Sequence, residues 1–327
     1  MEIFYNFEFP VYNFVYIMKN LLVTGSIAFD RISVFKDRFA NHILPKKTHM
    51  INVSFTVDDL AVHLGGTGGN IAYNLAQLGD TPYLAGTVGA DFGDYRNWLE
   101  RNGVKLNYVK TIDGLLTAQA SIMTDLDDNQ ITAFYGGAMF RAHEATIDDL
   151  KDIAMAIVSP NGKEGMLYYA DHFRRHDIPF IADPGQAIPA FSGEELMTLI
   201  HGAHVLIVND YEWQLIQEKT DLNCGNSGQY VDHLIVTYGE KGSKIRSREN
   251  DGIEVPTVQA TEVVDPTGCG DAYRAGLMWG LKQQYPIEKA AHVGAWIAAQ
   301  AVTKAGTQNH SIKKGEFEEF LEKLDVA

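Results

Sequence analysis

Residues 264–276 read VDPTGCGDAYRAG, and this stretch constrains the fold and chemistry of the chain more than any other. Its Gly-x-Gly pair stands directly before a segment of helical character, and Asp271 falls in the first turn of that helix. Backbone amides at a helix start, with no side chains over them, form a site for an anion such as phosphate. A carboxylate aimed at such a site is well placed to take a proton from an attacking hydroxyl. From this loop alone, an ordinary aspartate that stabilises the helix dipole remains the alternative.

The composition excludes several classes of protein. The chain has 327 residues and a formal net charge of −15, which permits one large domain and disfavours a nucleic-acid partner. Its two cysteines, Cys224 and Cys269, exclude a disulfide framework and are typical of a reducing, cytoplasmic location. No stretch reaches the roughly 20 apolar residues of a membrane span, so we expect no membrane partner.

The first residues differ from the rest of the chain. Met1–Ile17 is rich in aromatic residues and holds no Lys or Arg, so it lacks the positive region of a signal peptide. Met18-Lys19-Asn20 followed by an apolar strand resembles a natural start. We therefore expect residues 1–17 to be an extension outside the fold and residues 18–327 to form the domain.

Most of the remaining chain alternates short apolar runs with segments of helical period. The expected strands are Leu21–Ser26, Tyr83–Val88, Ala154–Val158, Pro179–Ala182, Val205–Val208 and Leu234–Thr237. The expected helices are Asn70–Leu78, Tyr95–Asn102, Gly165–His176, Gly193–Ile200, Tyr211–Glu218, Ala272–Gln284, Ile287–Lys304 and Lys314–Leu324. Such alternation predicts an α/β fold in three layers, with a mainly parallel central sheet covered on both faces.

Two segments, 31–62 and 115–135, break this rhythm. They alternate apolar with polar residues, as in Met50–Val57, and predict antiparallel strands of a small second sheet inserted into a core made of 18–30, 63–114 and 136–327. Such a sheet could act as a lid that closes over a substrate, and a plain structural hairpin is the alternative. Exposed strand edges invite pairing, so we expect a homodimer through the lid.

A second glycine cluster, GGTGGN at residues 65–70, precedes a helix. Its glycines let the backbone approach a ligand closely. The spacing is not G-x-G-x-x-G, which disfavours a dinucleotide-binding oxidoreductase. Asn70 either binds a ligand hydroxyl or caps the helix.

Two further motifs follow expected strands. In NDYE, residues 209–212, Glu212 fits either a water-mediated Mg²⁺ contact or a helix-dipole partner. In TYGEKG, residues 237–242, the backbone either lines a nucleotide or turns between two strands. The histidines show no metal-ligand spacing.

Together, in order and spacing, the four motifs resemble those of the ribokinase-like (PfkB) carbohydrate and nucleoside kinases, from about Met18 to the end. Cys269 stands where alanine is usual in that family. The resemblance implies a ribokinase-like fold, ATP as co-substrate and Mg²⁺. A monovalent cation such as K⁺ beside Asp265 is implied by the resemblance only.

Within the family, the chain is most similar to bacterial adenosine kinases of this type. The segments that carry the similarity are residues 24–30 (TGSIAFD), 57–60 (VDDL), 89–96 (GADFGDYR), 134–139 (FYGGAM) and 209–213 (NDYEW). By this resemblance, Asp30 and Asn70 would bind the ribose hydroxyls, Ser26 would lie near the base and Phe134 would pack against it, or form part of the core. Ala120 is small where a second aromatic wall is expected, and Ala187 follows Gln186 where similar sequences carry two glutamines.

The sequence therefore predicts three sets of site residues. The catalytic set is Asp271 with the backbone amides of Gly268, Cys269 and Gly270. The substrate set is Ser26, Asp30, Gly65, Gly66, Asn70, Phe134, Met139 and Gln186. The ATP set is Asn209, Thr237, Gly239, Gly242, Gly268 and Gly270, with Glu212 for Mg²⁺ and Asp265 for a monovalent cation.

The expected activity is ATP-dependent phosphorylation of the 5′-hydroxyl of adenosine, as in purine salvage, giving AMP and ADP. A kinase for another nucleoside, or for a sugar such as ribose or fructose, is the nearest alternative. A nucleotide- or sugar-binding regulator without catalysis is a further one.

Overall fold

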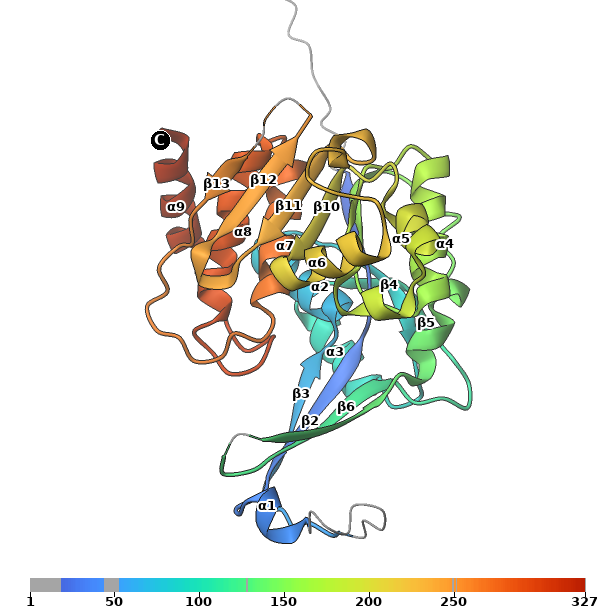
Figure 1. Ribbon diagram of the computed structural model, residues 1–327, viewed down its shortest axis with the longest axis vertical. Helices are drawn as coiled ribbons and strands as arrows, with labels where there is room; N and C mark the ends of the chain where they lie inside the picture. The colour runs from blue at the N-terminus through green and yellow to red at the C-terminus, as the bar shows by residue number, and fades with distance from the viewer. Residues whose placement is uncertain (1–18, 44–52, 128, 249, 251, 327) are drawn as a thin grey trace, which may run out of the picture.

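A nine-stranded sheet lies at the centre of the molecule, in the strand order β13-β12-β11-β10-β9-β8-β1-β4-β5 (Figure 1). The computed structural model describes residues 19–43, 53–127, 129–248, 250 and 252–326. The parallel strands are β1 (Asn20–Thr24), β4 (Tyr83–Val88), β5 (Lys105–Thr111), β8 (Ile153–Val158), β9 (Phe180–Ala182), β10 (Val205–Asn209) and β11 (His233–Thr237). Two antiparallel strands that the sequence analysis did not identify, β12 (Ser243–Ser247) and β13 (Ile253–Val255), complete one edge.

Helices cover both faces of this sheet, as the alternating pattern predicts. On one face lie α2 (Thr67–Gln77), α3 (Gly93–Arg101), α7 (Cys269–Lys282) and α8 (Ile287–Ala301), with α9 (Lys314–Val326) packed outside α8. On the other lie α4 (Lys163–Arg175), α5 (Gly193–Ile200) and α6 (Asp210–Lys219). Short 3₁₀ turns join them: η2 (Gly137–Glu144), η3 (Gly185–Ala190), η4 (Ser227–Gln229) and η5 (Gly239–Lys241). Each face thus has its own apolar core, which explains why the strands are continuous apolar runs.

A separate four-stranded sheet, the lid, projects from one end of the core (Figure 1). Its order is β3-β2-β6-β7, with β2 (Ala28–Val34), β3 (Leu60–Gly65), β6 (Ala118–Thr124) and β7 (Gln130–Tyr135), and α1 (Phe39–His42) lies at its tip. The two hairpins are antiparallel, but β2 and β6 pair in parallel. The expected small sheet of antiparallel strands is therefore confirmed, and its two hairpins are joined through a parallel pair because β2 and β6 leave the core in the same direction.

The expected strand Met50–Val57 is not formed in its described part, residues 53–57. The ring of Phe55 instead packs against Phe35 and Phe39, with centroids 4.9 and 5.1 Å apart. Phe55 thus joins an aromatic cluster near the lid tip, and residues 53–57 pair with no strand. Residues 50–52 and the predicted extension 1–17 lie outside the described residues.

Some helix ends differ from the expected ones. Helix α7 begins at Cys269, three residues before the expected Ala272, because Gly268 already turns the chain into the helix. Helix α8 ends at Ala301 rather than Lys304. Within the described ranges, no helix has both the length and the apolar character needed to cross a membrane.

Candidate active site

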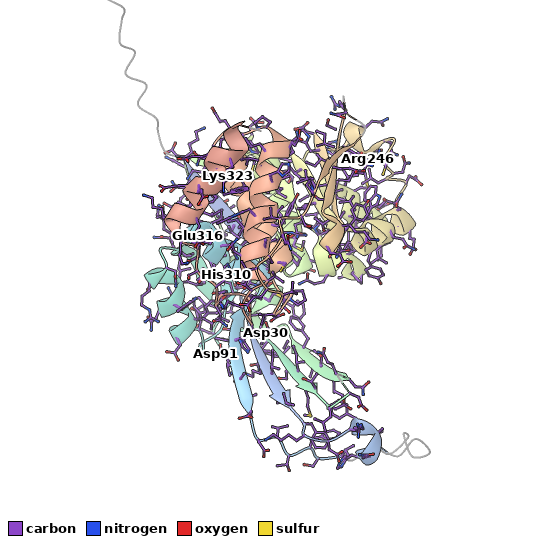
Figure 2. All side chains as sticks on the ribbon, turned by 90° about the vertical axis from the view of Figure 1, so that its left-hand side faces the viewer. Asp30, Asp91, Arg246, His310, Glu316 and Lys323 are labelled. Carbon is purple, nitrogen blue, oxygen red and sulfur yellow. The ribbon has the colours of Figure 1, made fainter. Side chains whose placement is uncertain are left out.

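The carboxyl ends of the parallel strands and the root of the lid enclose a cavity of about 640 Å³. In open α/β sheets, ligands bind at this edge of the sheet. Figure 2 shows Asp30 at the junction between the lid and the core. Nine of the predicted residues line the cavity: Ser26, Asp30, Gly66, Asn70, Phe134, Met139, Gln186, Gly268 and Asp271. Segments more than two hundred residues apart in sequence therefore meet at one site.

Asp271 is the central carboxylate of this cavity. Its Oδ2 accepts a hydrogen bond of 2.8 Å from Asn70 Nδ2. Burial raises the pKa of Asp271 to about 7; the Asn70 hydrogen bond and Arg274 oppose this shift, whereas Asp183 and Asp30 add to it. A carboxylate that titrates near neutral pH is suited to accept a proton during a reaction.

Asn70 does not cap helix α2, because the residue at the N-cap position is Gly66. Gly66 has φ of 83°, and a Cβ there would lie 2.6 Å from the Ser26 carbonyl oxygen, so only glycine fits. The Asn70 side chain lies inside the fold, where its amide holds the Asp271 carboxylate. The interpretation of Asn70 as a helix cap is therefore wrong.

The start of helix α7 is where the sequence analysis predicts an anion site. Gly268 has φ of 80°, and a Cβ there would lie 2.8 Å from Thr307 Cγ2. Amides in the first turn of a helix have no partner within the helix. The Cys269 amide, however, donates to the Pro266 carbonyl oxygen at 3.2 Å, so this one of the three predicted amides already has a partner. Burial raises the pKa of the Cys269 thiol to about 11, which makes it a weak nucleophile at neutral pH.

Arg274 and Asp183 form a buried ion pair beside this helix, which the sequence analysis did not identify. The guanidinium donates to both carboxylate oxygens of Asp183, at 2.5 and 2.6 Å. It also donates to the Gly270 carbonyl oxygen at 3.0 Å. Because Asp183 follows strand β9, this pair ties the first turn of α7 to the end of the central sheet.

The lid contributes the second half of the cavity. Asp30 lies on β2 opposite His63 on β3; burial raises the pKa of Asp30 and His63 opposes the shift. A Cβ on Gly65 would come within 2.5 Å of Asp30 Oδ2, so this glycine makes room for the carboxylate. Phe134 on β7 is 57% exposed and lines the cavity, which contradicts the alternative that it is a core aromatic.

The residues predicted for ATP lie on neighbouring strands. Asn209 and Thr237 are register partners at the ends of β10 and β11. Gly239 and Gly242 lie in the turn from β11 into β12, so this segment does connect two strands, as the alternative interpretation expects.

Glu212 and Asn209 form a capping box at the start of α6. Glu212 Oε2 accepts from the Asn209 amide at 2.8 Å, and Asn209 Oδ1 accepts from the Glu212 amide at 2.7 Å. Burial raises the pKa of Glu212, and Asp183 adds to this shift. The described residues hold no cluster of three or more His, Cys, Asp or Glu side chains that could bind a metal ion. A Mg²⁺ ion here would therefore depend on phosphate and water oxygens besides a carboxylate.

Both carboxylate oxygens of Asp265 accept hydrogen bonds from backbone amides. Its Oδ1 accepts from the Thr267 amide and its Oδ2 from the Gly306 amide, each at 2.9 Å. Burial raises its pKa, but these hydrogen bonds outweigh that effect and the pKa lies below its ordinary value. The carboxylate is thus ionised and fixed in place, as a monovalent cation would require.

The sequence analysis did not predict several residues that line the cavity, among them Asn161, Lys163, Glu164 and Thr307. Asn161 follows strand β8, so the rule that ligands bind at the ends of parallel strands could have pointed to it. Thr307 lies in an irregular loop after α8, where no pattern indicates a site.

The sequence model of the pfkB family carbohydrate kinases matches residues 18–314. The chain belongs to this family and is a phosphotransferase. The family expected from the four motifs is thereby confirmed, as is the ribokinase-like fold with its separate lid sheet.

Individual relatives agree with this assignment. A nucleoside kinase of Methanocaldococcus jannaschii is 30% identical over 274 residues, which cover 83% of this chain and 90% of that protein. The structure of Burkholderia thailandensis nucleoside kinase in complex with inosine has a TM-score of 0.82 and 38% identity, and covers 94% of this chain and 98% of that one. The same kinase in complex with ADP-inosine has a TM-score of 0.80 and 39% identity, and covers 94% of this chain and 96% of that one.

Proposed function

We propose that this protein transfers the γ-phosphoryl group of ATP to the 5′-hydroxyl of a purine nucleoside, with adenosine as its preferred substrate. The observation that carries the proposal is one cavity lined both by Asp271 from the core and by Phe134 from the lid. The first is suited to accept the hydroxyl proton, and the exposed aromatic face of the second is suited to a purine. The kinase relatives above support both halves of the reaction.

In this proposal, the 5′-oxygen attacks the γ-phosphorus, its proton passes to Asp271, and the bond to the leaving ADP breaks. Phosphoryl transfer depends mainly on positioning and on stabilising the charge of the equatorial oxygens. The Gly268 and Gly270 amides at the start of α7 would do this, with Mg²⁺ held near Glu212 through water. ATP would lie along Asn209, Thr237, Gly239 and Gly242, and K⁺ beside Asp265.

The ribose would be held at the lid root. Asp30 lies in the cavity with two carboxylate oxygens that can accept from sugar hydroxyls. Ser26, Met139 and Gln186 line the same cavity and would surround the base. Asn70 would contact the sugar only through the second N–H of its amide, since its Oδ1 accepts from Gln308 and its first N–H is donated to Asp271.

Inosine is the second candidate substrate. Asn161 Oδ1 accepts from the Gly162 amide at 2.9 Å, which leaves its Nδ2 as a donor, and this atom is buried with no partner among the described residues. A donor in the cavity suits an acceptor on the base, which can be O6 of a 6-oxopurine or a ring nitrogen of either purine. The relative solved with inosine favours the same candidate.

A coupled ADP-release assay with adenosine, inosine, guanosine, cytidine, ribose and fructose tests this proposal. We expect kcat/KM to be highest for adenosine and about tenfold or more lower for cytidine and the free sugars. A maximum with inosine would reassign the base, and a maximum with ribose or fructose would reject a nucleoside kinase. No ADP release with any acceptor would favour a regulator that only binds.

We also propose that two copies associate through the lid. Every residue of β7 is exposed, and Val62 on β3 and Ile131 on β7 are 48% and 44% exposed. Apolar side chains along the two edge strands of a sheet are typical of a surface that pairs with another chain.

A further inference from the structure

Gln308 lies in the loop after α8 and is only 2% exposed. Its side-chain amide makes three hydrogen bonds inside the fold. Nε2 donates to Asn70 Oδ1 at 3.0 Å and to the Tyr95 hydroxyl at 2.5 Å. Oε1 accepts from the Trp98 indole N–H at 3.1 Å. Gln308 thus joins helix α3 to the residue that holds Asp271.

These contacts determine which way two successive amide groups face. The Trp98 indole nitrogen can only donate, so the oxygen of Gln308 must face it and the nitrogen must face Asn70. Asn70 must then present its oxygen to Gln308 and its nitrogen to Asp271. A reversal of either amide would bring two donors or two acceptors together in a buried place, at a cost in free energy.

We propose that Gln308 is a positioning residue, which keeps the amide nitrogen of Asn70 turned toward the Asp271 carboxylate. The inference rests on the proposed function, in which Asp271 accepts the proton of the substrate hydroxyl. Gln308 acts through Asn70 and does not touch the substrate. Without it, Asn70 is free to turn its oxygen toward Asp271 and so disfavour the ionised carboxylate.

The same hydrogen bonds reach the root of the lid. The Tyr95 hydroxyl donates to the carbonyl oxygen of Gly65, the last residue of β3, at 2.8 Å. Thr307 Oγ1 lies 2.7 Å from Asn70 Oδ1 and 2.9 Å from the Leu64 carbonyl oxygen, and its single proton serves one of them at a time. The hydrogen bonds around Asn70 therefore continue to strand β3 of the lid.

Other charged and titratable groups around Asp271 are unchanged by a substitution at position 308. On its own helix these are Arg274 and Cys269, and from the strand ends they are Asp183 and Asp30. Tyr95 on α3 loses the hydrogen bond from Gln308 in the variant, but burial raises its pKa and keeps it neutral, so it adds no charge. Burial raises the pKa of Asp271 to about 7 and the Asn70 hydrogen bond opposes this shift. Loss of that bond therefore raises the pKa of Asp271 further. As a result, the acid limb of the profile of kcat against pH moves to higher pH.

Gln308→Met tests this inference, because it keeps the length of the side chain and removes its hydrogen bonds. At saturating adenosine and ATP, we expect kcat at about pH 6 to fall about tenfold while the nucleoside KM changes less than about twofold. The loss should shrink toward about pH 9, where Asp271 is ionised in both proteins. Gln308→Glu, which presents only acceptors, should move the acid limb further than Gln308→Met.

Gln77→Met is the control, since it makes the same substitution at a half-buried glutamine whose hydrogen bonds, to Asn102 and from the Ile312 amide, do not include Asn70 or Asp271. It should leave the acid limb where it is. A folded Gln308→Met protein with the wild-type pH profile, or with an equal loss of kcat at every pH, would overturn the inference. If Gln308→Met does not fold, Trp98→Phe removes the donor that orients Gln308 and should move the acid limb in the same direction by a smaller amount; an unmoved limb counts against the inference.

The failure of the inference can be told apart from the failure of the proposed function. Asp271→Asn with turnover within about tenfold of the wild type would reject the proposed base, and the inference with it. An inactive Asp271→Asn protein together with an unaltered profile for Gln308→Met would reject only the role of Gln308.

Discussion

The central sheet and the lid differ in how far the side chains of their strands are buried. Strands such as β10 have both faces covered by helices, and the residues Val205–Val208 are fully buried. Strand β7 of the lid is exposed along its whole length. A buried frame can hold a carboxylate at a fixed place, whereas an exposed sheet leaves its apolar side chains available to a ligand or a second chain. We therefore expect changes in the core to affect turnover, and changes in the lid to affect binding and association.

The largest expected effect is that of Asp271→Asn in the core. Loss of the proton acceptor should lower kcat by about 10²–10⁴-fold, with the nucleoside still bound. Rapid-quench measurement of ADP formation, beside calorimetric titration with adenosine, would check both statements. Turnover within about tenfold of the wild type would show that Asp271 is not the base.

The same substitution should make the folded protein more stable at alkaline pH. The pKa of Asp271 is raised from 3.8 to about 7, so the folded state binds its proton more tightly than the unfolded state. The wild type therefore loses stability as the pH rises from about 4 to about 7, and no more above that range. Asp271→Asn removes this penalty, so it should gain about 2 kcal/mol or more at pH 8 and much less near pH 4.

Urea unfolding of both proteins across this pH range is the measurement. Asp113→Asn, in an exposed turn, is the control for a simple change of net charge. An equal difference in unfolding free energy at pH 4 and pH 8 would be inconsistent with a buried carboxylate at position 271.

Phe134→Ala tests the lid side of the comparison. Removing the aromatic ring should raise the adenosine KM about tenfold and change kcat at saturation by less than about threefold. Tyr135→Ala is the matched control, because neighbouring residues of a strand point to opposite faces and Tyr135 is not among the residues that line the cavity. Equal effects of the two substitutions would argue against Phe134 as the base contact.

The smallest expected change is in assembly. Val62→Asp places a charge on the exposed edge strand β3 and should convert a lid-paired dimer into monomers, a twofold drop in mass by light scattering. Kinase activity per chain should persist at saturating substrate, since Val62 is not a cavity-lining residue. A monomeric wild type would reject the dimer outright.

Local patterns in the sequence were sufficient to predict most strands and helices of the α/β core. The strand Tyr83–Val88 and the helix Gly193–Ile200 form with the expected ends, because the apolar runs and flanking Gly residues act over a few residues. The strand expected over Met50–Val57 is wrong in its described part, residues 53–57, where Phe55 packs into an aromatic cluster and no strand pairing forms. β12 and β13 were not identified because they lie at the edge of the sheet and are only partly buried.

By itself, the sequence determined the family, the α/β core with its lid, and the carboxylate at Asp271, because each depends on a short motif or a local period. Only the tertiary structure decided what surrounds that carboxylate. Asn70 reaches Asp271 across 201 positions, Arg274 pairs with Asp183 across 91, and Gln308 comes from a loop with no pattern of its own. Hydrogen bonds between such distant residues depend on how the layers pack, and their orientation follows from which partner can only donate.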